Sequence, residues 1–303
     1  MHVSTIVVSY NTRELTRECL TSVYDKTNGV DFEVIVVDNG STDGSADMVT
    51  EFFPNAILIK SDRNLGFGPA NNLAIRRASG KYVFLLNPDT ALLNNAMRIF
   101  FDFMEDGGQQ QVGAVGGYLL DGEGRAQHSY GEFVTVRDIY RFDTPRLVRR
   151  KLRQGLRSVL GPGLASQLAA RLPKRKAVGS ATQRTDAATQ PAPAIKRVDY
   201  VTGADLFLRG SVLHEIGVFD ERYFLYAEEM DLQYRMCRAG YTRLVIAGPR
   251  IVHHLSRSLY RAEKGRLQEA AKRTFLSKHF PVRYALCRLA SGLTGQPRQP
   301  VTR

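Results

Sequence analysis

An acidic residue follows an apolar stretch of this chain at a spacing that suits metal and phosphate chemistry. Five apolar residues, 82–86, precede Asn87, Pro88 and Asp89. Such a run is typical of a strand buried on both faces of a parallel sheet, and a proline must end it. Asp89 should therefore lie at the carboxyl end of the sheet, where open α/β sheets bind ligands. A carboxylate there can hold a divalent cation that grips a phosphate, although Asn-Pro-Asp is equally a turn sequence.

A second acid follows another apolar run. Asp38 and Asn39 come directly after Val36 and Val37, so they should share the sheet edge with Asp89. Asp38 can accept hydrogen bonds from a nucleobase or a ribose. The sequence Gly-Ser-Thr-Asp-Gly that follows is also typical of an ordinary polar turn.

A glycine-containing loop, residues 63–68, runs into a predicted helix and carries Arg63 and Asn64 at its start. Helix N-termini and arginines both favour phosphate. The loop has neither the GxGxxG nor the GxxxxGK[ST] pattern, and it does not follow the first strand. These observations argue against a dinucleotide-binding fold and against a P-loop.

A second acidic cluster, Glu228, Glu229 and Asp231, begins another predicted helix. The helix dipole favours acids at this end, which is a purely structural explanation. Three carboxylates in four residues exceed that need, and like charges raise one another's pKa, which suits a general base near neutral pH. Ahead of the cluster, the small residues Thr202, Gly203 and Ala204 could line a pocket.

Two histidines follow the strand-like residues 250–252. A neutral imidazole of His253 could complete a metal site or meet a diphosphate. A histidine pair at such a place is more often structural.

Strand-like and helix-like segments alternate through the first 120 residues, which implies a mostly parallel sheet with helices on both faces. The expected strands are 3–9, 32–37, 56–60, 82–86 and 112–119, and the expected helices are 13–27, 45–53, 69–79 and 94–105. After residue 198 we expect strands at 206–208 and 244–247 and helices at 211–216, 231–239 and 265–279. We expect the tail after Arg288 to lack regular structure.

The net charge of +12 belongs to one segment. Residues 137–197 hold 15 Lys or Arg against three acids, and the rest of the chain holds 27 of each. A globally basic nucleic-acid-binding domain does not fit this distribution. Residues 146–172 have apolar residues at helical spacing between arginines, and residues 173–194 have a composition typical of disorder. A basic amphipathic helix predicts contact with an anionic membrane surface; a solvated linker, or a helix that packs on the domain, remains the alternative.

The three cysteines, Cys19, Cys237 and Cys287, are far apart and form no CxxC motif, so they indicate neither a disulfide framework nor a zinc site. We find no signal-peptide pattern and no apolar run long enough to span a bilayer. We therefore expect a cytoplasmic protein, which could bind peripherally to the inner face of the plasma membrane.

Together, the segments resemble the inverting GT-A glycosyltransferases of family 2, and in particular the rhamnosyltransferase-like branch of bacterial surface-polysaccharide synthesis. Four motifs match in order: Ile-Val-Val-Ser-Tyr-Asn; Val-Val-Asp-Asn-Gly-Ser-Thr-Asp-Gly-Ser; Arg-Asn-x-Gly-Phe with Asn-Pro-Asp-Thr; and Gly-Ala followed by Phe-Asp-Glu-Arg-Tyr-Phe-Leu-Tyr-x-Glu-Glu-x-Asp-Leu. The match covers residues 3–130 and 198–280. It implies the α/β GT-A fold, a nucleoside-diphosphate-sugar donor, and a glycan or lipid-linked acceptor.

The resemblance also implies roles for individual residues. Asp89 would coordinate Mg²⁺ or Mn²⁺, His253 would face the metal or the diphosphate, and Glu229 would be the catalytic base. The nucleotide would lie against Asp38, Asn39, Arg63, Asn64 and Asn87, and the acceptor against Thr202, Gly203 and Ala204.

Three departures from the family pattern matter. Asn87 replaces the first acid of a strict DxD motif. Glu229 stands where the family often has Asp, so Glu228 or Asp231 could be the base instead. The processive Gln-x-x-Arg-Trp motif is absent, and the chain has no Trp, so transfer of a single sugar is expected.

The expected organisation is a nucleotide-sugar-binding half (1–133), a basic insert (134–197), an acceptor and catalytic half (198–280) and a basic tail (281–303). Two other functions compete with this interpretation. A sugar-1-phosphate nucleotidyltransferase would usually need a glycine- and lysine-rich loop where this chain has residues 9–13. A non-enzymatic module that binds membranes or polyanions through residues 137–197 would make Asp89 dispensable.

Overall fold

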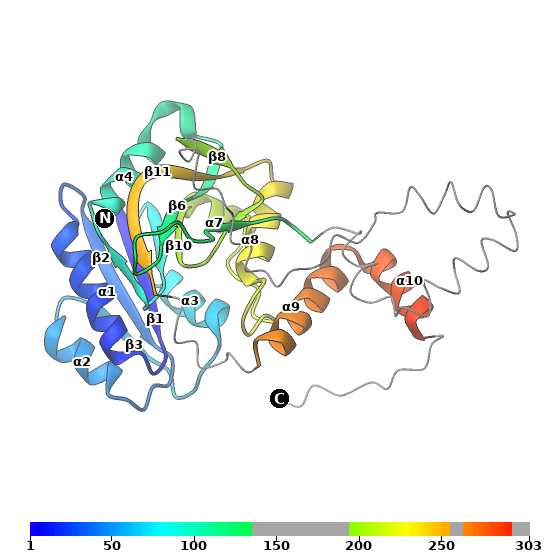
Figure 1. Cartoon of the computed structure of the whole chain (residues 1–303), viewed down its shortest axis with the longest axis horizontal. Helices are drawn as coiled ribbons and strands as arrows, with labels where there is room; N and C mark the ends of the chain where they lie inside the picture. Colours follow the sequence, from blue (N-terminus) through cyan, green and yellow to red (C-terminus); the bar gives the residue numbers. More distant parts are fainter. Residues whose placement is uncertain (135–193, 255–262, 293–303) are drawn as a thin grey trace, which may run out of the picture. The chain divides into compact units, whose positions relative to one another are not determined.

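The computed structural model describes residues 1–134, 194–254 and 263–292. The chain divides into two compact units, residues 1–133 with 192–275, and residues 134–191 with 276–303 (Figure 1). The segments predicted as an amphipathic helix and as disordered lie outside the described residues, apart from Ala194 at the end of the second. No helix within the described ranges is long and apolar enough to cross a membrane.

The first unit is built on a central mixed sheet with the strand order β3-β2-β1-β4-β10-β6-β11-β5, and β8 pairs with β11. The pairs β1–β2, β1–β4, β2–β3 and β6–β11 are parallel, whereas β10 runs antiparallel between β4 and β6. The strands are β1 (Val3–Ser9), β2 (Phe32–Asp38), β3 (Ile57–Lys60), β4 (Tyr82–Leu86), β5 (Thr90–Leu92), β6 (Val112–Leu120), β8 (Ile195–Arg197), β10 (Asp205–Arg209) and β11 (Thr242–His253). Strands β7 (Tyr130–Gly131) and β9 (Tyr200–Val201) form a separate two-stranded sheet.

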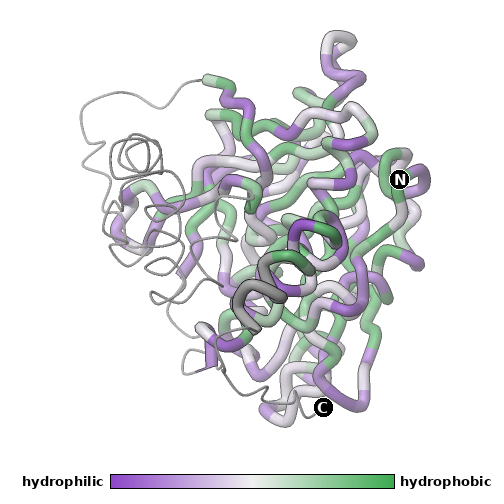
Figure 2. Tube along the Cα trace, turned by 90° about the vertical axis from the view of Figure 1, so that its right-hand side faces the viewer, coloured by the Kyte–Doolittle hydropathy of each residue, from purple (hydrophilic) through white to green (hydrophobic). Residues whose placement is uncertain are grey.

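Helices cover both faces of the central sheet, as predicted. One face packs on α1 (Arg13–Lys26), α2 (Ser45–Phe52) and α4 (Ala96–Glu105), which contribute residues at helical spacing such as Met97, Phe100 and Met104. The other face packs on α3 (Phe67–Ile75), α7 (Gly210–Ile216) and α8 (Glu228–Arg238). All five residues of β4 are buried, because apolar residues face a helix layer on each side. In Figure 2, hydrophobic and hydrophilic residues are interspersed along the described chain.

The predicted α/β class is confirmed, but several details differ from expectation. The helix expected at 69–79 runs from Phe67 to Ile75, and strands β7 and β9 were not predicted. Strand β5 was not predicted, because three residues are too few to show a period. Strand β11 is one long strand that continues past a register shift between Ile246 and Arg250. Strand β8 lies inside the range expected to be an insert. After α9 (Lys264–His279), helix α10 (Pro281–Gly292) extends beyond Arg288, where no regular structure was expected.

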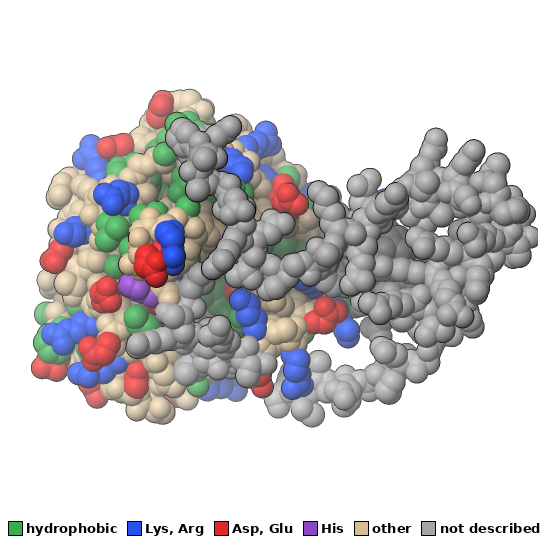
Figure 3. Space-filling model, in the orientation of Figure 1, with side chains coloured by type: hydrophobic (Ala, Val, Ile, Leu, Met, Phe, Trp, Pro, Cys, Tyr) green, Lys and Arg blue, Asp and Glu red, His purple; other side chains and the backbone are tan. Residues whose placement is uncertain are grey.

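Acidic and basic side chains are interspersed on the face of the first unit that is drawn in Figure 3. This distribution agrees with the sequence count, in which the charges outside residues 137–197 cancel.

Candidate active site

The carboxyl ends of β1, β2 and β4 lie side by side. Ser9 pairs with Asp38, and Val7 pairs with Leu86, three residues before Asp89. A cleft of about 210 Å³ opens at this edge. Of the residues predicted to hold a nucleotide or metal, four line it: Asn39, Asn64, Asn87 and Asp89. A larger, shallow groove of about 460 Å³ runs along α1, but it contains none of the predicted site residues.

A tight turn after β4 presents Asp89. The carbonyl of Asn87 accepts hydrogen bonds from the Thr90 backbone N–H at 3.2 Å and from the Thr90 hydroxyl at 2.7 Å. The end of β11 runs beside this turn, because the His254 backbone N–H donates to the carbonyl of Asp89 at 2.9 Å. The turn is therefore held both by its own bonds and by the last strand of the sheet.

The Asp89 and His253 side chains meet at this turn. Asp89 Oδ1 lies 3.3 Å from His253 Nε2, and Asn87 Nδ2 lies 3.5 Å from the same nitrogen. The described residues contain no group of three His, Cys, Asp or Glu that could hold a metal alone. One carboxylate and one imidazole nevertheless fit a cation that takes its other ligands from phosphate and water, as Mg²⁺ commonly does. The pair suits a metal bound together with a phosphorylated ligand.

Asp38 is buried and is not among the residues that line the cleft. Its Oδ2 accepts from the Ser41 N–H at 3.3 Å, whereas Oδ1 is buried and has no partner. A buried acceptor without a donor calls for a ligand or water to supply one. The Arg63 side chain is exposed and does not line the cleft.

Asn39 ties two loops of the cleft together. Its Nδ2 donates to Asn64 Oδ1 at 2.9 Å and to the carbonyl of Gly66 at 3.1 Å, and its Oδ1 accepts from the Leu65 N–H at 2.9 Å. Both the nitrogen and the oxygen of the Asn39 side-chain amide therefore bond to other parts of the protein. The position of Asn64 in the cleft therefore depends on Asn39.

The two glutamates at the start of α8 follow a strained backbone. Tyr226 and Ala227 adopt left-handed conformations, with φ of 72° and 64°, and each such non-glycine residue costs on the order of 1 kcal/mol. Glu228 is 3% exposed, and Glu229 is half-buried. Each has a buried Oε2 without a hydrogen-bond partner.

Burial raises the pKa of both glutamates. The neighbouring Glu229 charge raises the pKa of Glu228 further. A carboxylate with a raised pKa is a stronger base than an ordinary surface carboxylate, so it accepts the proton of a hydroxyl more readily.

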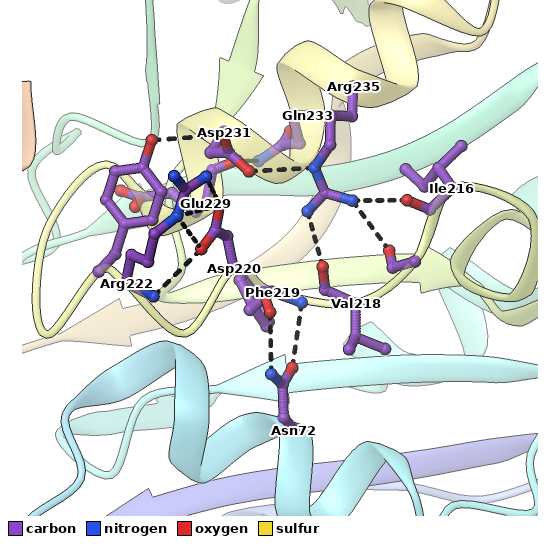
Figure 4. Close-up of polar contacts among 12 residues, drawn as sticks. Asn72, Ile216, Val218, Phe219, Asp220, Arg222, Glu229, Asp231, Gln233 and Arg235 are labelled. Carbon is purple, nitrogen blue, oxygen red and sulfur yellow. Dashed lines mark hydrogen bonds and ion pairs between the residues drawn. The ribbon is translucent and has the colours of Figure 1, made fainter. Parts of the chain in front are cut away.

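Asp231, the third acid of the cluster, has both carboxylate oxygens bonded to other side chains of the protein (Figure 4). Its side chain has no exposed surface. Its Oδ1 accepts from the Tyr223 hydroxyl at 3.3 Å, and its Oδ2 pairs with Arg235 Nε at 3.0 Å. Asp231 is therefore poorly placed to take a proton from a ligand.

The predicted acceptor residues lie next to the cleft. The backbone N–H of Asn87 donates to the carbonyl of Ala204 at 3.0 Å. A Cβ on Gly203 would come within 3.0 Å of the Phe67 ring, which lines the cleft. Thr202 is fixed by its N–H, which donates to the Ser129 carbonyl at 3.0 Å. The segment thus lies between the Phe67 wall and the Asn87 turn.

Sequence reasoning did not select the aromatic and aliphatic residues of the cleft. These are Val8, Tyr10, Leu15, Phe67, Phe224 and Leu225. Tyr10 directly follows β1, so the rule that ligands bind after strand ends could have found it. Phe224 reaches the cleft from a distant part of the chain, which no local pattern reveals.

The family model described as glycosyl transferase family 2 matches residues 4–160. The N-acetylglucosaminyl-diphospho-decaprenol L-rhamnosyltransferase of Mycobacterium tuberculosis is 27% identical over 262 residues, which cover 80% of this chain and 73% of that protein.

Solved structures with low sequence identity share the fold. TarS of S. aureus has a TM-score of 0.53 at 16% identity, and the match covers 92% of this chain but only 44% of TarS. The mannosyltransferase PcManGT of Pyrobaculum calidifontis, solved with GDP-Man and Mn²⁺, has a TM-score of 0.52 at 18% identity and covers 98% of this chain and 76% of that one.

Proposed function

The chain belongs to glycosyl transferase family 2, and from that premise we propose that it transfers one sugar from a nucleoside diphosphate sugar to a hydroxyl of a glycan or lipid-linked acceptor. It is a glycosyltransferase of surface-polysaccharide synthesis. A poly(ribitol-phosphate) beta-glucosyltransferase of Bacillus spizizenii and an O-antigen biosynthesis protein of Myxococcus xanthus are among its relatives and support this. The observation that carries the finer proposal is the Asp89–His253 pair at the edge of a cleft, 3.3 Å from oxygen to nitrogen. Such a pair could hold a cation that offsets the charge of a leaving diphosphate.

Asp89 and His253 would hold a divalent cation. The carboxylate of Asp89 suits Mg²⁺ or Mn²⁺, and His253 would add a nitrogen donor. When bound, the cation supplies charge stabilisation for the departing diphosphate. PcManGT was solved with Mn²⁺, and this likeness supports a divalent metal here.

The nucleotide would occupy the cleft, in contact with Asn64 and Asn87. The unpartnered Oδ1 of Asp38 would accept a hydrogen bond from the base or ribose. Arg63 would reach the nucleotide from its exposed position, while Asn39 would act by holding Asn64 in place.

Glu229 would accept the proton of the acceptor hydroxyl, whose oxygen then attacks the anomeric carbon and inverts it. Its half-buried position gives it both access to a ligand and a raised pKa. Glu228 is the alternative base, but its deeper burial disfavours direct contact with an acceptor. Thr202, Gly203 and Ala204 would form the adjacent acceptor pocket.

The acceptor would be carried on a lipid, as the name of the mycobacterial relative states for that protein. The basic residues between 137 and 197 would bring a cytoplasmic, peripheral enzyme to an anionic membrane surface. Helix α10 supports this, because Val282 and Leu286 lie one turn apart and are 71% and 61% exposed. Exposed apolar residues beside Arg283 suit a membrane interface.

The proposal is tested by incubating the protein with Mn²⁺, an acceptor lipid and a panel of nucleoside diphosphate sugars. We expect one sugar to be transferred per acceptor, with release of an equal amount of nucleoside diphosphate. A nucleotidyltransferase would instead consume a nucleoside triphosphate and release pyrophosphate. Absence of transfer from every donor, with Mn²⁺ present, would contradict the proposal.

Membrane binding has its own test. The full chain and a chain lacking residues 137–193, which keeps strand β8, would be sedimented with vesicles of phosphatidylglycerol and phosphatidylethanolamine. The proposal predicts weaker sedimentation after the deletion; equal sedimentation would remove residues 137–193 from the account.

A further inference from the structure

The loop of residues 219–227, here called the acid-pair loop, leads directly into Glu228 and Glu229. We propose that Asn72 is a positioning residue that sets this loop, and therefore the proposed base Glu229, against the donor cleft. The inference rests on the proposed function and adds a residue to which that function assigns no role.

Asn72 grips the start of the acid-pair loop through both ends of its amide (Figure 4). Its Nδ2 donates to the carbonyl of Phe219 at 2.9 Å, and its Oδ1 accepts from the Phe219 N–H at 3.0 Å. A further bond joins Nδ2 to Glu221 Oε1 at 3.1 Å. Asn72 is 1% exposed, so water cannot replace these bonds cheaply.

The helix that carries Asn72 also forms the wall of the cleft. Phe67, the first residue of α3, lines the cleft, and its N–H donates to the carbonyl of Phe224 at 2.9 Å. Gly66, with φ of 86°, allows this approach, because a Cβ there would lie 2.0 Å from the Phe224 oxygen. One rigid helix therefore touches both the donor cleft and the acid-pair loop.

The residues just before the acid-pair loop are fixed to α8. Arg235 donates to the carbonyls of Ile216 and Val218 at 2.7 Å and 2.6 Å, and it pairs with Asp231. These bonds hold residues 216–218 to the helix that bears the acids. The two Asn72–Phe219 hydrogen bonds join this assembly to α3.

The expected consequence is catalytic. A shift of about 1 Å between a reacting group and its substrate can cost about 10²-fold in rate, even when binding is unchanged. Loss of the Asn72 amide should loosen the acid-pair loop without touching the nucleotide.

The chain offers a matched control in Asn71. It has the same side chain and is also 1% exposed, but its Nδ2 donates only within its own helix, to the carbonyl of Phe67 at 2.9 Å. Asn72→Ala should lower kcat by about 10- to 100-fold, leave the dissociation constant for the nucleoside diphosphate within about threefold, and speed amide hydrogen exchange over residues 219–230. Asn71→Ala should leave kcat and the exchange of those residues near wild-type values.

If Asn72→Ala does not fold, Asn72→Asp keeps the shape and the acceptor for the Phe219 N–H but removes the donor. This variant must then show the lower kcat and the faster exchange, with the dissociation constant for the nucleoside diphosphate unchanged. Equal kcat and equal exchange in the Asn72 and Asn71 variants would overturn the inference. A wild-type protein without transfer activity would instead refute the proposed function, and the exchange data would still decide whether Asn72 holds the loop.

Discussion

The imidazole of His253 lies 3.3 Å from the carboxylate of Asp89, although Asp89 follows β4 and His253 ends the last strand of the sheet. The register explains this proximity. Strand β11 pairs antiparallel with the short strand β5, so that His253 lies opposite Thr90, the residue after Asp89. The three residue pairs between β5 and β11 thus bring together two potential metal ligands from distant segments of the chain.

Replacement of Asp89 should remove metal-dependent activity. We expect Asp89→Ala to lower kcat by at least about 10²-fold, because charge on the leaving group loses its stabilisation. Electron paramagnetic resonance titration of Mn²⁺ with nucleoside diphosphate present would measure the accompanying loss of metal affinity. Asp47→Ala is the control, since the Asp47 side chain is 90% exposed on α2. Near-wild-type turnover of Asp89→Ala would show that its assigned role is wrong.

Neutralising the proposed base should stop the reaction without unfolding the protein. Glu229→Gln should lower kcat by about 10²- to 10⁴-fold, the usual contribution of general base catalysis. Its unfolding midpoint should equal or exceed that of the wild type, because a partly buried carboxylate with a raised pKa is replaced by a neutral amide. A single-turnover assay and a thermal melt on one sample test both parts. If Glu228→Gln were inactive and Glu229→Gln active, the base would be Glu228.

Asp231 should behave differently from Glu229. Asp231→Ala leaves Arg235 without its carboxylate partner, and breaking such a buried pair costs about 3–5 kcal/mol. Urea unfolding should therefore show a large loss of stability, while the fraction that remains folded at low temperature keeps measurable activity. A stable but inactive Asp231→Ala protein would point to a catalytic role instead.

Asp205 should make stability fall as pH rises. Its side chain is fully buried, Oδ2 accepts from the Gly117 N–H at 2.6 Å, and Oδ1 has no partner. Burial raises its pKa well above the ordinary value. The folded state therefore keeps a proton that the unfolded chain releases. The contribution of Asp205 to the free energy of unfolding is fully present below pH 3.8, the ordinary pKa of an aspartate. Above that pH it declines by about 1.4 kcal/mol per pH unit, until the pH reaches the folded-state pKa.

The variant Asp205→Asn cannot release this proton. Unfolding free energies measured at several pH values should consequently show a shallower decline above pH 4 to 5 than in the wild type. Identical slopes for the two proteins would mean that Asp205 is ionised in the folded state.

The sequence predicted the elements whose position follows from local pattern and from strand order. Asp38 and Asp89 were expected at one edge because parallel strands end on the same side, and the register of β1 with β2 and β4 agrees. The antiparallel direction of β10 was not predictable, since a buried apolar strand reads alike in both directions. Likewise, Asn72 and Phe219 are 147 positions apart, and a contact over such a distance in the sequence cannot be predicted from local hydrophobic periodicity. The Asp231–Arg235 pair is different, because its spacing of four within a helix could have been recognised in the sequence.

The central claim is that a cation at Asp89 joins the protein to a diphosphate. Isothermal titration of nucleoside diphosphates into the wild-type protein, with and without Mn²⁺, tests it most directly. The account predicts binding at least about fivefold tighter with Mn²⁺, and loss of that difference in Asp89→Ala. Equal affinity with and without the metal, or an unchanged Mn²⁺ effect in Asp89→Ala, would contradict it.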